Sequence, residues 1–377
     1  MFQIKGKIDS TNAPEFEKEI MGIKPTEIDA AELLYISSAG LRVLMKLKKE
    51  VGSVTVYNVN SEVFEILDIT GFTSILNVKK ALKEIDLTGK EILGQGAFGT
   101  VYRLDDERIV KVYRGDLSLE YIEREQQYAK AAFISGIPSI IAFDVVKTGG
   151  GYGVILEAMN SDTLSRVITN EPEKRDEYIA KLVQLAKTLH SKEILNDSVA
   201  SLKSYLYSKL DDDYMKENLS ADELAVLRSI LDVMKETNNL VHGDLHPGNI
   251  MMHDGELMLI DMGGVTRGNP LYDLACTFRA LFFVPKHNAE ICRRSFGLEP
   301  ELAFEIGKKF FAMYTGITDP QALKAYMDKI RLVFCFFYVT ELATHPAKEL
   351  YTQPILDNML RAIVIPNAEI IKKILSE

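Results

Sequence analysis

Hydrophobic and polar residues follow two different patterns along the chain, and the change between them divides it. In the first eighty residues, short apolar segments alternate with stretches whose apolar side chains recur every three or four positions, as at Leu41, Leu44 and Met45. That spacing places side chains on one face of a helix. The pattern predicts a small α/β unit. Its expected strands are 2–8, 27–29 and 54–57, and its expected helices are 13–21, 39–49 and 62–70.

From about residue 90 the pattern changes to adjacent strands. Two strand-like segments come first, EILGQGAFGTVYRL and RIVKVY, separated by an Asp-Asp turn. A helix and two further strands, in GIPSIIAFDVV and GYGVILEAM, follow them. From Lys174 onward most of the chain has helical spacing. No linker rich in Pro, Gly or Ser separates the regions, so we expect the domains to pack directly.

Composition narrows the class of protein. The chain has 377 residues, enough for two or three domains, with 47% hydrophobic and 26% charged residues. A formal charge of −10 argues against nucleic acid or an anionic membrane as the main partner. The three cysteines are odd in number and lack metal-ligand spacing, which predicts reduced thiols. The start has no apolar signal segment, and the most apolar run, LVFCFFYV, is too short to span a bilayer. We therefore expect a cytoplasmic protein.

The most informative stretch is VHGDLHPGNIMMHDGELMLIDMGG, residues 241–264. Asp254-Gly255 is a strong signal for a two-residue hairpin turn. Pairing the strands outward from this turn sets Asn249 opposite Ile260, one step from Asp261. Since cross-strand neighbours lie about 5 Å apart, an amide oxygen and a carboxylate arrive together at one end of the hairpin.

These oxygens predict a magnesium site, because Mg²⁺ prefers oxygen ligands. Asp244, five residues before Asn249, lies in a loop that contains Gly243, Pro247 and Gly248. We expect its carboxylate to point toward the same pocket.

Gly94, Gly96 and Gly99 form a GxGxxG pattern. A dinucleotide fold needs this pattern between a strand and a helix, whereas here a strand, TVYRL, follows it. The glycines are therefore expected to close a hairpin and to place backbone N–H groups over phosphates. Taken alone, the pattern also fits a plain glycine-rich turn.

Lys111 lies one strand later in RIVKVY and shares a strand face with apolar neighbours. A lysine in this position usually extends along an edge to reach water. Beneath a glycine flap it would instead reach the phosphates, provided that an acid held it in place. Glu125 is our choice for that acid, and Glu123 is the competitor.

The chain contains, in this order, a glycine flap, a strand lysine, a helix glutamate, HGDLHPGN and IDMGG. Their order and spacing match those of the protein-kinase-like fold. Residues 88–377 resemble that superfamily, most closely the aminoglycoside phosphotransferase and choline kinase branch, whose catalytic loop commonly reads HGDLHPGN. The resemblance implies a bilobal α+β domain. Its N-lobe, residues 88–160, would be an antiparallel sheet that holds the nucleotide phosphates and contains the hinge. Its C-lobe, residues 161–377, would be mostly helical and would contain the catalytic loop, the metal site and the acceptor site.

The resemblance also implies ATP and Mg²⁺, with phosphoryl transfer to a hydroxyl of a small molecule. It assigns the catalytic role to Asp244, the metal to Asn249 and Asp261, and the ion pair to Lys111 and Glu125. A carboxylate such as Asp244 suits this chemistry because it accepts the hydroxyl proton late in transfer.

Further residues receive supporting roles. Glu157 to Met159 fall where the hinge contacts adenine through backbone groups. His242 is expected to brace the loop, and His246 stands where protein kinases commonly carry a lysine, which places it near the transferred phosphoryl group. Asp273 either anchors the catalytic loop or caps a helix.

Departures from the protein-kinase pattern favour a small-molecule enzyme. Gly243 replaces the arginine before the catalytic Asp, and Met262-Gly263 replaces the Phe-Gly pair after the metal Asp. No APE-like segment follows.

The first domain resembles another family. LLYISSAGLRVLMKLKKE, with GKID before it and NVNSEVFEILDITGF after it, resembles a STAS domain of the anti-sigma factor antagonist type over residues 1–82. In bacterial antagonists the second Ser of an Asp-Ser-Ser-Gly loop is phosphorylated by a partner kinase. Aligned on Gly40, this chain has Ala39 there, which cannot accept a phosphate. Ser38 is either a substitute acceptor or, as is commoner for a serine before a helix, an N-cap.

Three hypotheses follow. The first is a phosphotransferase for a small hydroxyl compound, whose STAS domain docks a regulatory protein or regulates the enzyme. The second is a protein serine kinase that acts on a STAS or related regulatory protein, including its own Ser38. The third is an inactive nucleotide-binding scaffold, which is disfavoured because every charged group that the chemistry needs is present.

Overall fold

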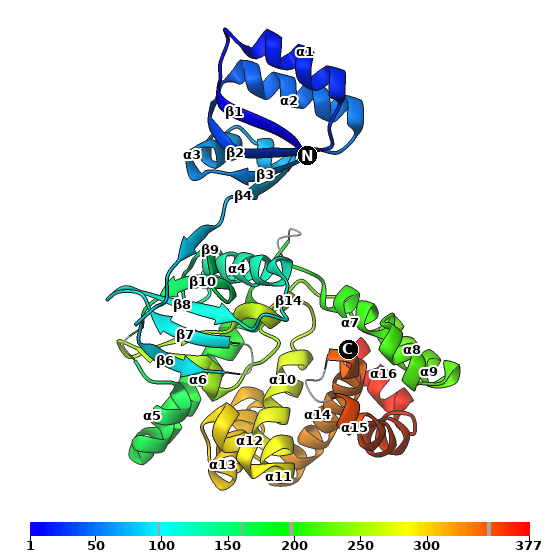
Figure 1. Ribbon diagram of the computed structural model, residues 1–377. Helices are drawn as coiled ribbons and strands as arrows, with labels where there is room; N and C mark the ends of the chain where they lie inside the picture. The colour runs from blue at the N-terminus through cyan, green and yellow to red at the C-terminus, as the bar shows by residue number, and fades with distance from the viewer. Residues whose placement is uncertain (97–98, 160, 196–198, 345–347) are drawn as a thin grey trace. The chain divides into compact units, whose positions relative to one another are not determined.

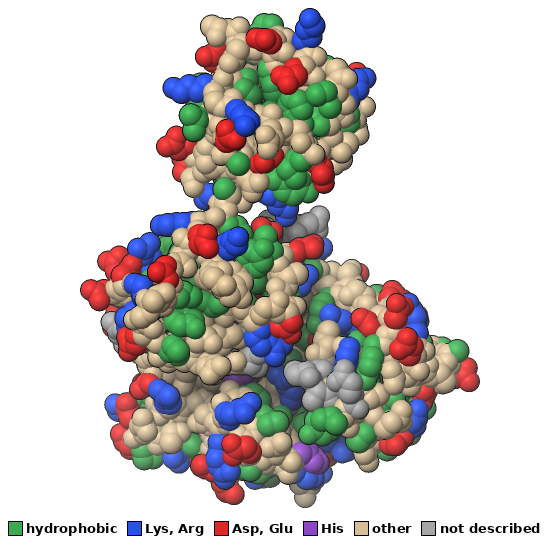
Figure 2. All heavy atoms as spheres, viewed as in Figure 1, with side chains coloured by type: hydrophobic (Ala, Val, Ile, Leu, Met, Phe, Trp, Pro, Cys, Tyr) green, Lys and Arg blue, Asp and Glu red, His purple; other side chains and the backbone are tan. Residues whose placement is uncertain are grey.

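The computed structural model describes residues 1–96, 99–159, 161–195, 199–344 and 348–377. The chain forms two compact units (Figure 1). Unit 1 comprises Met1–Asp86 with Val146–Gly149, and unit 2 comprises Leu87–Val145 with Gly150–Glu377. Charged side chains of both signs are spread over both units (Figure 2). Among the described helices, none is long and apolar enough to cross a membrane.

Unit 1 contains a four-stranded sheet in which all neighbouring strands are parallel, in the order β1-β2-β3-β4. The strands are β1 (Phe2–Ile8), β2 (Glu27–Ile36), β3 (Thr55–Val59) and β4 (Asn77–Lys80). They alternate with helices α1 (Ala13–Ile23), α2 (Ser38–Val51) and α3 (Ser61–Ile69), and η1 (Phe72–Ser74) precedes β4. The predicted α/β alternation is confirmed. The sequence pattern missed β4 and residues 30–36 of β2.

The helical spacing of apolar residues in unit 1 produces its core. Leu41, Leu44 and Leu47 of α2 are all buried, and they belong to the same apolar cluster as Ile28 and Leu33 of β2. Removing such side chains from water is the main stabilising term in a small domain.

The N-cap of α2 is Ser37, and the prediction that Ser38 caps this helix is wrong. Ser37 has extended backbone angles and accepts a hydrogen bond from the Gly40 N–H at 3.5 Å. Ser38 is the first helical residue and is exposed. Its hydroxyl is therefore not used as the cap.

Unit 2 begins with a sheet of neighbouring strands in the order β9-β10-β8-β7-β6. These are β6 (Ile92–Gln95), β7 (Gly99–Arg103), β8 (Arg108–Tyr113), β9 (Ala142–Thr148) and β10 (Gly151–Glu157). The pairs β6·β7, β7·β8 and β8·β10 are antiparallel. Helix α4 (Leu119–Ile134) packs on this sheet through β10. Residues 146–148 of β9 belong to unit 1, where they pair with β5 (Lys83–Ile85).

The remainder of unit 2 is mostly helical. The longest helices are α6 (Arg175–Ser191), α13 (Pro300–Thr315) and α14 (Pro320–Thr340). The other helical segments are α5 (Leu164–Asn170), η2 (Pro172–Lys174), α7 (Leu202–Leu210), α8 (Asp213–Asn218), α9 (Ala221–Val233), α10 (Leu271–Phe278), η5 (Arg279–Phe283), α11 (Val284–His287), α12 (Ala289–Ile291), η6 (Cys292–Phe296), η7 (Leu342–Thr344), α15 (Lys348–Ile355), η8 (Leu356–Val364) and α16 (Ala368–Ser376). The apolar run LVFCFFYV lies in α14, where residues 333–337 are buried in the protein core. The chain's three cysteines form no disulfide.

The hairpin predicted from Asp254-Gly255 is present. It consists of β12 (Ile250–His253) and β13 (Glu256–Leu259), with Ile250 opposite Leu259. Asp254 and Gly255 have φ angles of 48° and 82°, as a type I′ turn requires. Short segments β11 (Leu240–Val241), η3 (Pro247–Asn249), η4 (Met262–Gly264) and β14 (Thr266–Arg267) flank it. The register places the ends of both strands at the site described below.

A close approach in unit 1 supplies a test of its packing. A Cβ added at Gly40 would lie 2.7 Å from side-chain carbons of Ile8 and Ile36, which are both buried. At Gly22, in α1, an added Cβ would meet nothing within 4 Å.

We expect Gly40→Ala to lower the unfolding free energy of unit 1 by about 1–3 kcal/mol, because the added methyl group overpacks the core. Gly22→Ala should instead leave it unchanged or raise it by up to about 1 kcal/mol, since alanine favours helix. Hydrogen exchange of peptides from residues 1–80 in the full chain measures both. Equal effects of the two substitutions would contradict the packing described.

Candidate active site

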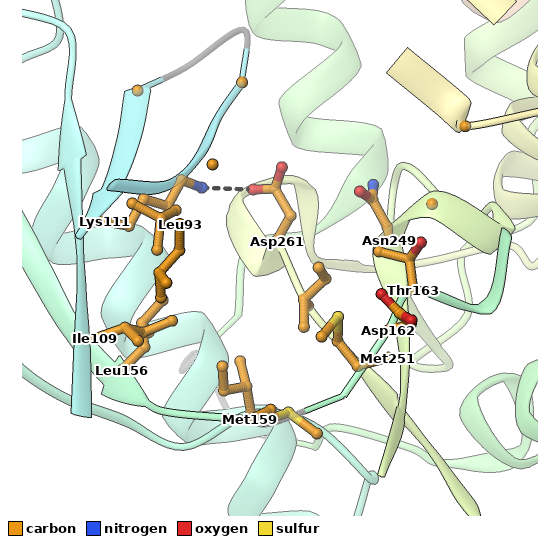
Figure 3. A pocket seen from close by; sticks show the side chains of 18 of the residues that line it. Leu93, Ile109, Lys111, Leu156, Met159, Asp162, Thr163, Asn249, Met251 and Asp261 are labelled. Carbon is orange, nitrogen blue, oxygen red and sulfur yellow. Dashed lines mark hydrogen bonds and ion pairs between the residues drawn. The ribbon is translucent and has the colours of Figure 1, made fainter. Parts of the chain in front are cut away.

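Unit 2 contains a cavity of about 950 Å³ between its sheet and its helical part. One end is apolar, with Leu93, Ile109, Leu156 and Met251 among its lining residues (Figure 3). The other end is polar and contains Lys111, Asn249 and Asp261 (Figure 3). The cavity therefore offers an apolar slot that leads to a charged end.

Lys111 lies at the centre of the charged end. Its Nζ is 2.9 Å from Glu125 Oε1 and 2.8 Å from Asp261 Oδ1. Burial by itself lowers the pKa of Lys111, but the carboxylates of Asp261 and Glu125 outweigh burial and hold the pKa well above its ordinary value. The ammonium group is therefore fully charged, and it joins β8, α4 and the end of the hairpin. The structure thus places Glu125 against Lys111.

Asp261 has an unusual backbone conformation. Its φ and ψ angles are 61° and 62°, in the left-handed region that few residues other than glycine adopt. Residues in such strained conformations cluster at functional sites. The turn that follows packs closely, since a Cβ added at Gly263 would lie 2.9 Å from Glu125 Oε2. The chain thus reverses direction while it presents the Asp261 carboxylate to Lys111.

Asn249 connects the hairpin to the loop before it. Its Nδ2 donates to the backbone oxygen and to Oδ2 of Asp244, both at 3.0 Å. Because a carboxylate oxygen accepts hydrogen bonds, the nitrogen must face Asp244. The amide oxygen of Asn249 is left on the side toward Asp261 (Figure 3).

His242 and His246 are both buried, and each is held as one tautomer. His242 Nδ1 accepts from the Asp244 N–H at 3.2 Å, so the proton is on Nε2, which donates to the Ile260 oxygen at 2.9 Å. His246 Nδ1 accepts from the Gly248 N–H at 3.1 Å. Its Nε2 therefore carries the proton and lies 3.4 Å from Asp244 Oδ2. His242 braces the loop, and His246 directs an N–H toward the carboxylate.

Asp273, on α10, holds the backbone of the same loop. Its carboxylate accepts from the His242 N–H at 2.8 Å and from the Gly243 N–H at 2.7 Å. It also lies 3.0 Å from Nε2 of His190 on α6, whose Nδ1 is 2.8 Å from the Tyr314 hydroxyl. Asp273 is fully buried. It thus connects two helices to the segment that carries Asp244.

Gly243 is required by geometry. It has φ +83°, and an added Cβ would lie 2.3 Å from the Gly264 oxygen. No side chain fits there. The loop and the segment after Asp261 are therefore in direct backbone contact.

Arg279, at the start of η5, was not predicted from the sequence. Its Nη2 is hydrogen-bonded to Asp244 Oδ1. Burial on its own raises the pKa of Asp244, but His246 and Arg279 outweigh it and hold the pKa well below its ordinary value. Asp244 is therefore a carboxylate throughout the physiological range. No local sequence pattern pointed to Arg279, because it follows Asp244 by 35 residues and the two meet only in the folded chain.

The glycine pattern is partly described. Gly94, Gly96 and Gly99 line the cavity. Gly99 also has a packing role, since an added Cβ would lie 2.0 Å from the Val112 oxygen on β8. The two residues between Gly96 and Gly99 lie outside the described residues. In the β6·β7·β8 ladder, Gly94 lies opposite Val101, which lies opposite Lys111, and Gly99 lies opposite Tyr113.

The predicted hinge residues differ in position. Met159 and Ala158 line the cavity, whereas Glu157 belongs to the end of β10, where its N–H donates to the Ile141 oxygen at 3.0 Å. The N–H of Ala158 donates to the Glu107 oxygen at 2.8 Å. Ala158 and Met159 are therefore the predicted hinge residues that line the cavity.

The oxygens at the charged end fit a magnesium ion that is shared with a phosphorylated ligand. No cluster of three or more His, Cys, Asp or Glu able to hold a metal is found among the described residues. Mg²⁺ commonly binds through one or two side chains together with substrate phosphates, so the donor set of Asn249 and Asp261 is of the right kind.

Residues 89–304 match the family model described as the phosphotransferase enzyme family (APH), and residues 1–85 match the model of the STAS domain. The match over residues 89–304 covers more than half of the chain and defines a phosphotransferase. The chain belongs to the phosphotransferase enzyme family, with a STAS domain at its N-terminal end. The expected order of folds, a small α/β STAS-like domain followed by a kinase-like domain with a sheet N-lobe and a helical C-lobe, is confirmed.

Individual relatives are similar to one domain or the other. The "Putative anti-sigma factor antagonist BtrV" of Bordetella bronchiseptica is 33% identical over 84 residues, which cover 20% of this chain and 72% of that protein. Among solved structures, a choline/ethanolamine kinase family protein from Mesorhizobium loti is 15% identical with a TM-score of 0.48, covering 76% of this chain and 92% of that one. The streptomycin-ATP-APH(2")-IIa ternary complex is 17% identical with a TM-score of 0.45, covering 72% and 92%.

The buried contacts of Asp273 generate a prediction. Asp273→Asn replaces one carboxylate oxygen by an amide nitrogen. That nitrogen cannot accept a hydrogen bond, so the backbone N–H of His242 or of Gly243 loses its acceptor. We expect the unfolding free energy to fall by about 2–3 kcal/mol. Urea denaturation of the full chain measures it.

The matched control is Asp319→Asn at the exposed N-cap of α14, where both residue types cap equally well and no change is expected. A loss at position 319 as large as that at 273 would argue against the buried hydrogen bonds as the cause.

Proposed function

We propose that the protein is an ATP- and magnesium-dependent phosphotransferase that transfers the γ-phosphate to a hydroxyl of a small molecule. The observation that carries this proposal is the convergence at one cavity end of Lys111, Asp261 and Asn249, with Asp244 hydrogen-bonded to Asn249. The apolar end has the character of an adenine slot, and Met159 lies at its edge. Family membership and a named relative with bound ATP support the same conclusion.

Each residue has a physical task in this proposal. Lys111, held by Glu125, neutralises charge on the nucleotide phosphates. The glycines of the β6·β7 segment bring backbone N–H groups over them. Asn249 and Asp261 would hold Mg²⁺, which neutralises charge on the phosphate oxygens when bound. Together these groups stabilise the charge that spreads over the transferred phosphoryl group.

Asp244 orients the acceptor hydroxyl. The hydroxyl oxygen forms a bond to the γ-phosphorus while the bond from that phosphorus to the β,γ-bridging oxygen breaks. ADP leaves with the electron pair, and the hydroxyl proton passes to Asp244. A carboxylate whose pKa is held below its ordinary value is a weak base, so the proton moves late in the step. Its main contribution is position.

The STAS domain is proposed to dock a regulatory protein. A second function, phosphorylation of a serine in a STAS domain, is favoured by one observation. Ser38 is exposed, and its hydroxyl does not serve as the N-cap of α2. Incubation with γ-labelled ATP separates the two. Label on the protein supports the second function, while ATP consumption only with added metabolites supports the first.

Substitutions at the site test catalysis directly. We expect Asp244→Asn to lower kcat by about 100- to 10,000-fold, because the amide neither accepts the proton nor orients the hydroxyl. Chelation of divalent cations should abolish turnover. The measurement is ATP consumption by the full-length protein with a metabolite library.

The control is Asp254→Asn, the same chemical change at the exposed hairpin turn, where asparagine also tolerates a positive φ. It should leave the rate unchanged. Unaltered turnover in Asp244→Asn would contradict the proposed role of Asp244. Nucleotide binding without ATP consumption in the wild-type protein would instead favour an inactive scaffold.

A further inference from the structure

The side of Asp244 that faces away from Asn249 is occupied by a cation. Asn249 and His246 both face Oδ2, whereas Arg279 Nη2 faces Oδ1. The side chains of Arg279 and Asp244 are 33% and 35% exposed, so this pair is open to solvent. An acceptor hydroxyl that approaches Asp244 must therefore also approach Arg279.

The guanidinium of Arg279 has unused donor capacity. An arginine carries five N–H donors. Arg279 Nε is buried without a hydrogen-bond partner among the described residues. Nε itself is out of reach of a ligand, but about a third of the Arg279 side chain is exposed beside its Nη2 contact to Asp244, so this outer edge of the guanidinium can bind a further acceptor group.

A second cation lies nearby on α7. Lys209 Nζ is 4.8 Å from the ring centre of Tyr205 and makes no ion pair with a described residue. Burial lowers the pKa of Lys209 and outweighs the carboxylates of Glu341 and Asp212, which act in the opposite direction. The Tyr205 hydroxyl donates to Glu341 Oε1 at 3.0 Å. The hydroxyls of Tyr205 on α7 and Tyr272 on α10 both donate to Glu341 Oε1, and Arg279 is the C-cap of α10, so the helices that carry the two cations meet at Glu341.

Glu341 and Asp212 are the carboxylates that act electrostatically on Lys209, and the Glu341 carboxylate is largely occupied by hydrogen bonds. Its Oε1 accepts from the hydroxyls of Tyr205 and Tyr272, the latter at 2.6 Å. Burial raises the pKa of Glu341, whereas the two tyrosine hydroxyls and the charges of Arg279 and Lys209 act in the opposite direction and favour a negative charge. Arg124, exposed on α4, adds a further positive charge that is felt by Lys209. In the space-filling view, Lys and Arg side chains gather in the hollow between the sheet and the helices of unit 2 (Figure 2).

We propose that the phosphoryl acceptor carries an anionic group, a phosphate or a carboxylate, beside its hydroxyl, and that Arg279 and Lys209 bind this group. The proposal rests on the proposed function and defines its substrate class. The anion takes over the contact with Arg279 and so leaves Asp244 Oδ1 to receive the hydroxyl. A cationic acceptor would instead bring its charge against the two cations, which is unfavourable.

Binding is tested first, without turnover. The full-length protein is saturated with Mg²⁺ and a non-hydrolysable ATP analogue, so that phosphate cannot occupy the nucleotide site. Its unfolding temperature is then followed against inorganic phosphate at constant ionic strength. We expect a saturable rise in the wild-type protein and at least a tenfold weaker response in Arg279→Gln. Asp244→Asn should bind phosphate several-fold more tightly, because Arg279 is released from its ion pair.

The matched control is Arg331→Gln, which removes an exposed arginine of α14. It should respond to phosphate like the wild-type protein. No response in the wild-type protein, or an equal response in Arg279→Gln, would overturn the proposal.

Turnover is tested second, with acceptors grouped as phosphate esters, carboxylates, neutral polyols and amino alcohols. We expect phosphorylation of a phosphate ester or a carboxylate, and the two groups tell which anion is bound. Arg279→Gln should raise KM for that acceptor by about 10- to 100-fold, as loss of a charged hydrogen-bond partner does, and leave KM for ATP unchanged. Arg279→Lys should recover part of the loss.

The outcomes separate this inference from the proposed function. Phosphorylation of neutral or cationic acceptors in preference to anionic ones would overturn the inference and leave the phosphotransferase standing. Failure of the protein to bind the magnesium nucleotide or to consume ATP with any acceptor would overturn the proposed function itself. An equal rise in KM for ATP and acceptor in Arg279→Gln would indicate a structural effect and also contradict the inference.

Discussion

The double ion pair of Lys111 is the interaction on which the architecture of unit 2 depends. One ammonium group contacts a carboxylate from α4 and another from the end of the hairpin, so three segments far apart in the chain meet at a single buried charge. A buried charge is costly unless it is paired, and the loss of either partner would leave an uncompensated ion. The sheet and the helical part therefore have a defined mutual position at the cavity. The site and the fold are stabilised by the same contact.

A second set of contacts fixes the loop that carries Asp244. Asp273 holds its backbone, His242 connects it to the hairpin, and Asn249 orients the carboxylate. Most of these partners are buried. Each histidine is held as a single tautomer, so its two ring nitrogens have fixed roles as hydrogen-bond donor and acceptor. The carboxylate is therefore positioned before any substrate arrives. Such preorganisation is the main means by which an enzyme favours a transition state.

Local rules predicted much of this arrangement. Turn chemistry at Asp254-Gly255 was enough to place Asn249 beside the end of β13, and helical spacing identified the core of unit 1. What the sequence could not provide were contacts between distant segments. Arg279 follows Asp244 by more than thirty residues, and nothing in its local pattern distinguishes it from a surface arginine on a helix. The N-cap of α2 was misplaced by one residue because Ser37 and Ser38 are chemically identical, and only backbone angles tell them apart.

The backbone contact at Gly243 has a consequence for how this protein can be controlled. Protein kinases hold an arginine at the corresponding place and use it to sense a phosphate on a neighbouring segment. Here the peptide of Gly264 fills the space in which any such side chain would begin, and the positive φ excludes other residues. Evolution cannot install that sensor by a single substitution without moving the main chain on both sides. The main-chain geometry at Gly243 therefore excludes control by a phosphate-sensing side chain at this position.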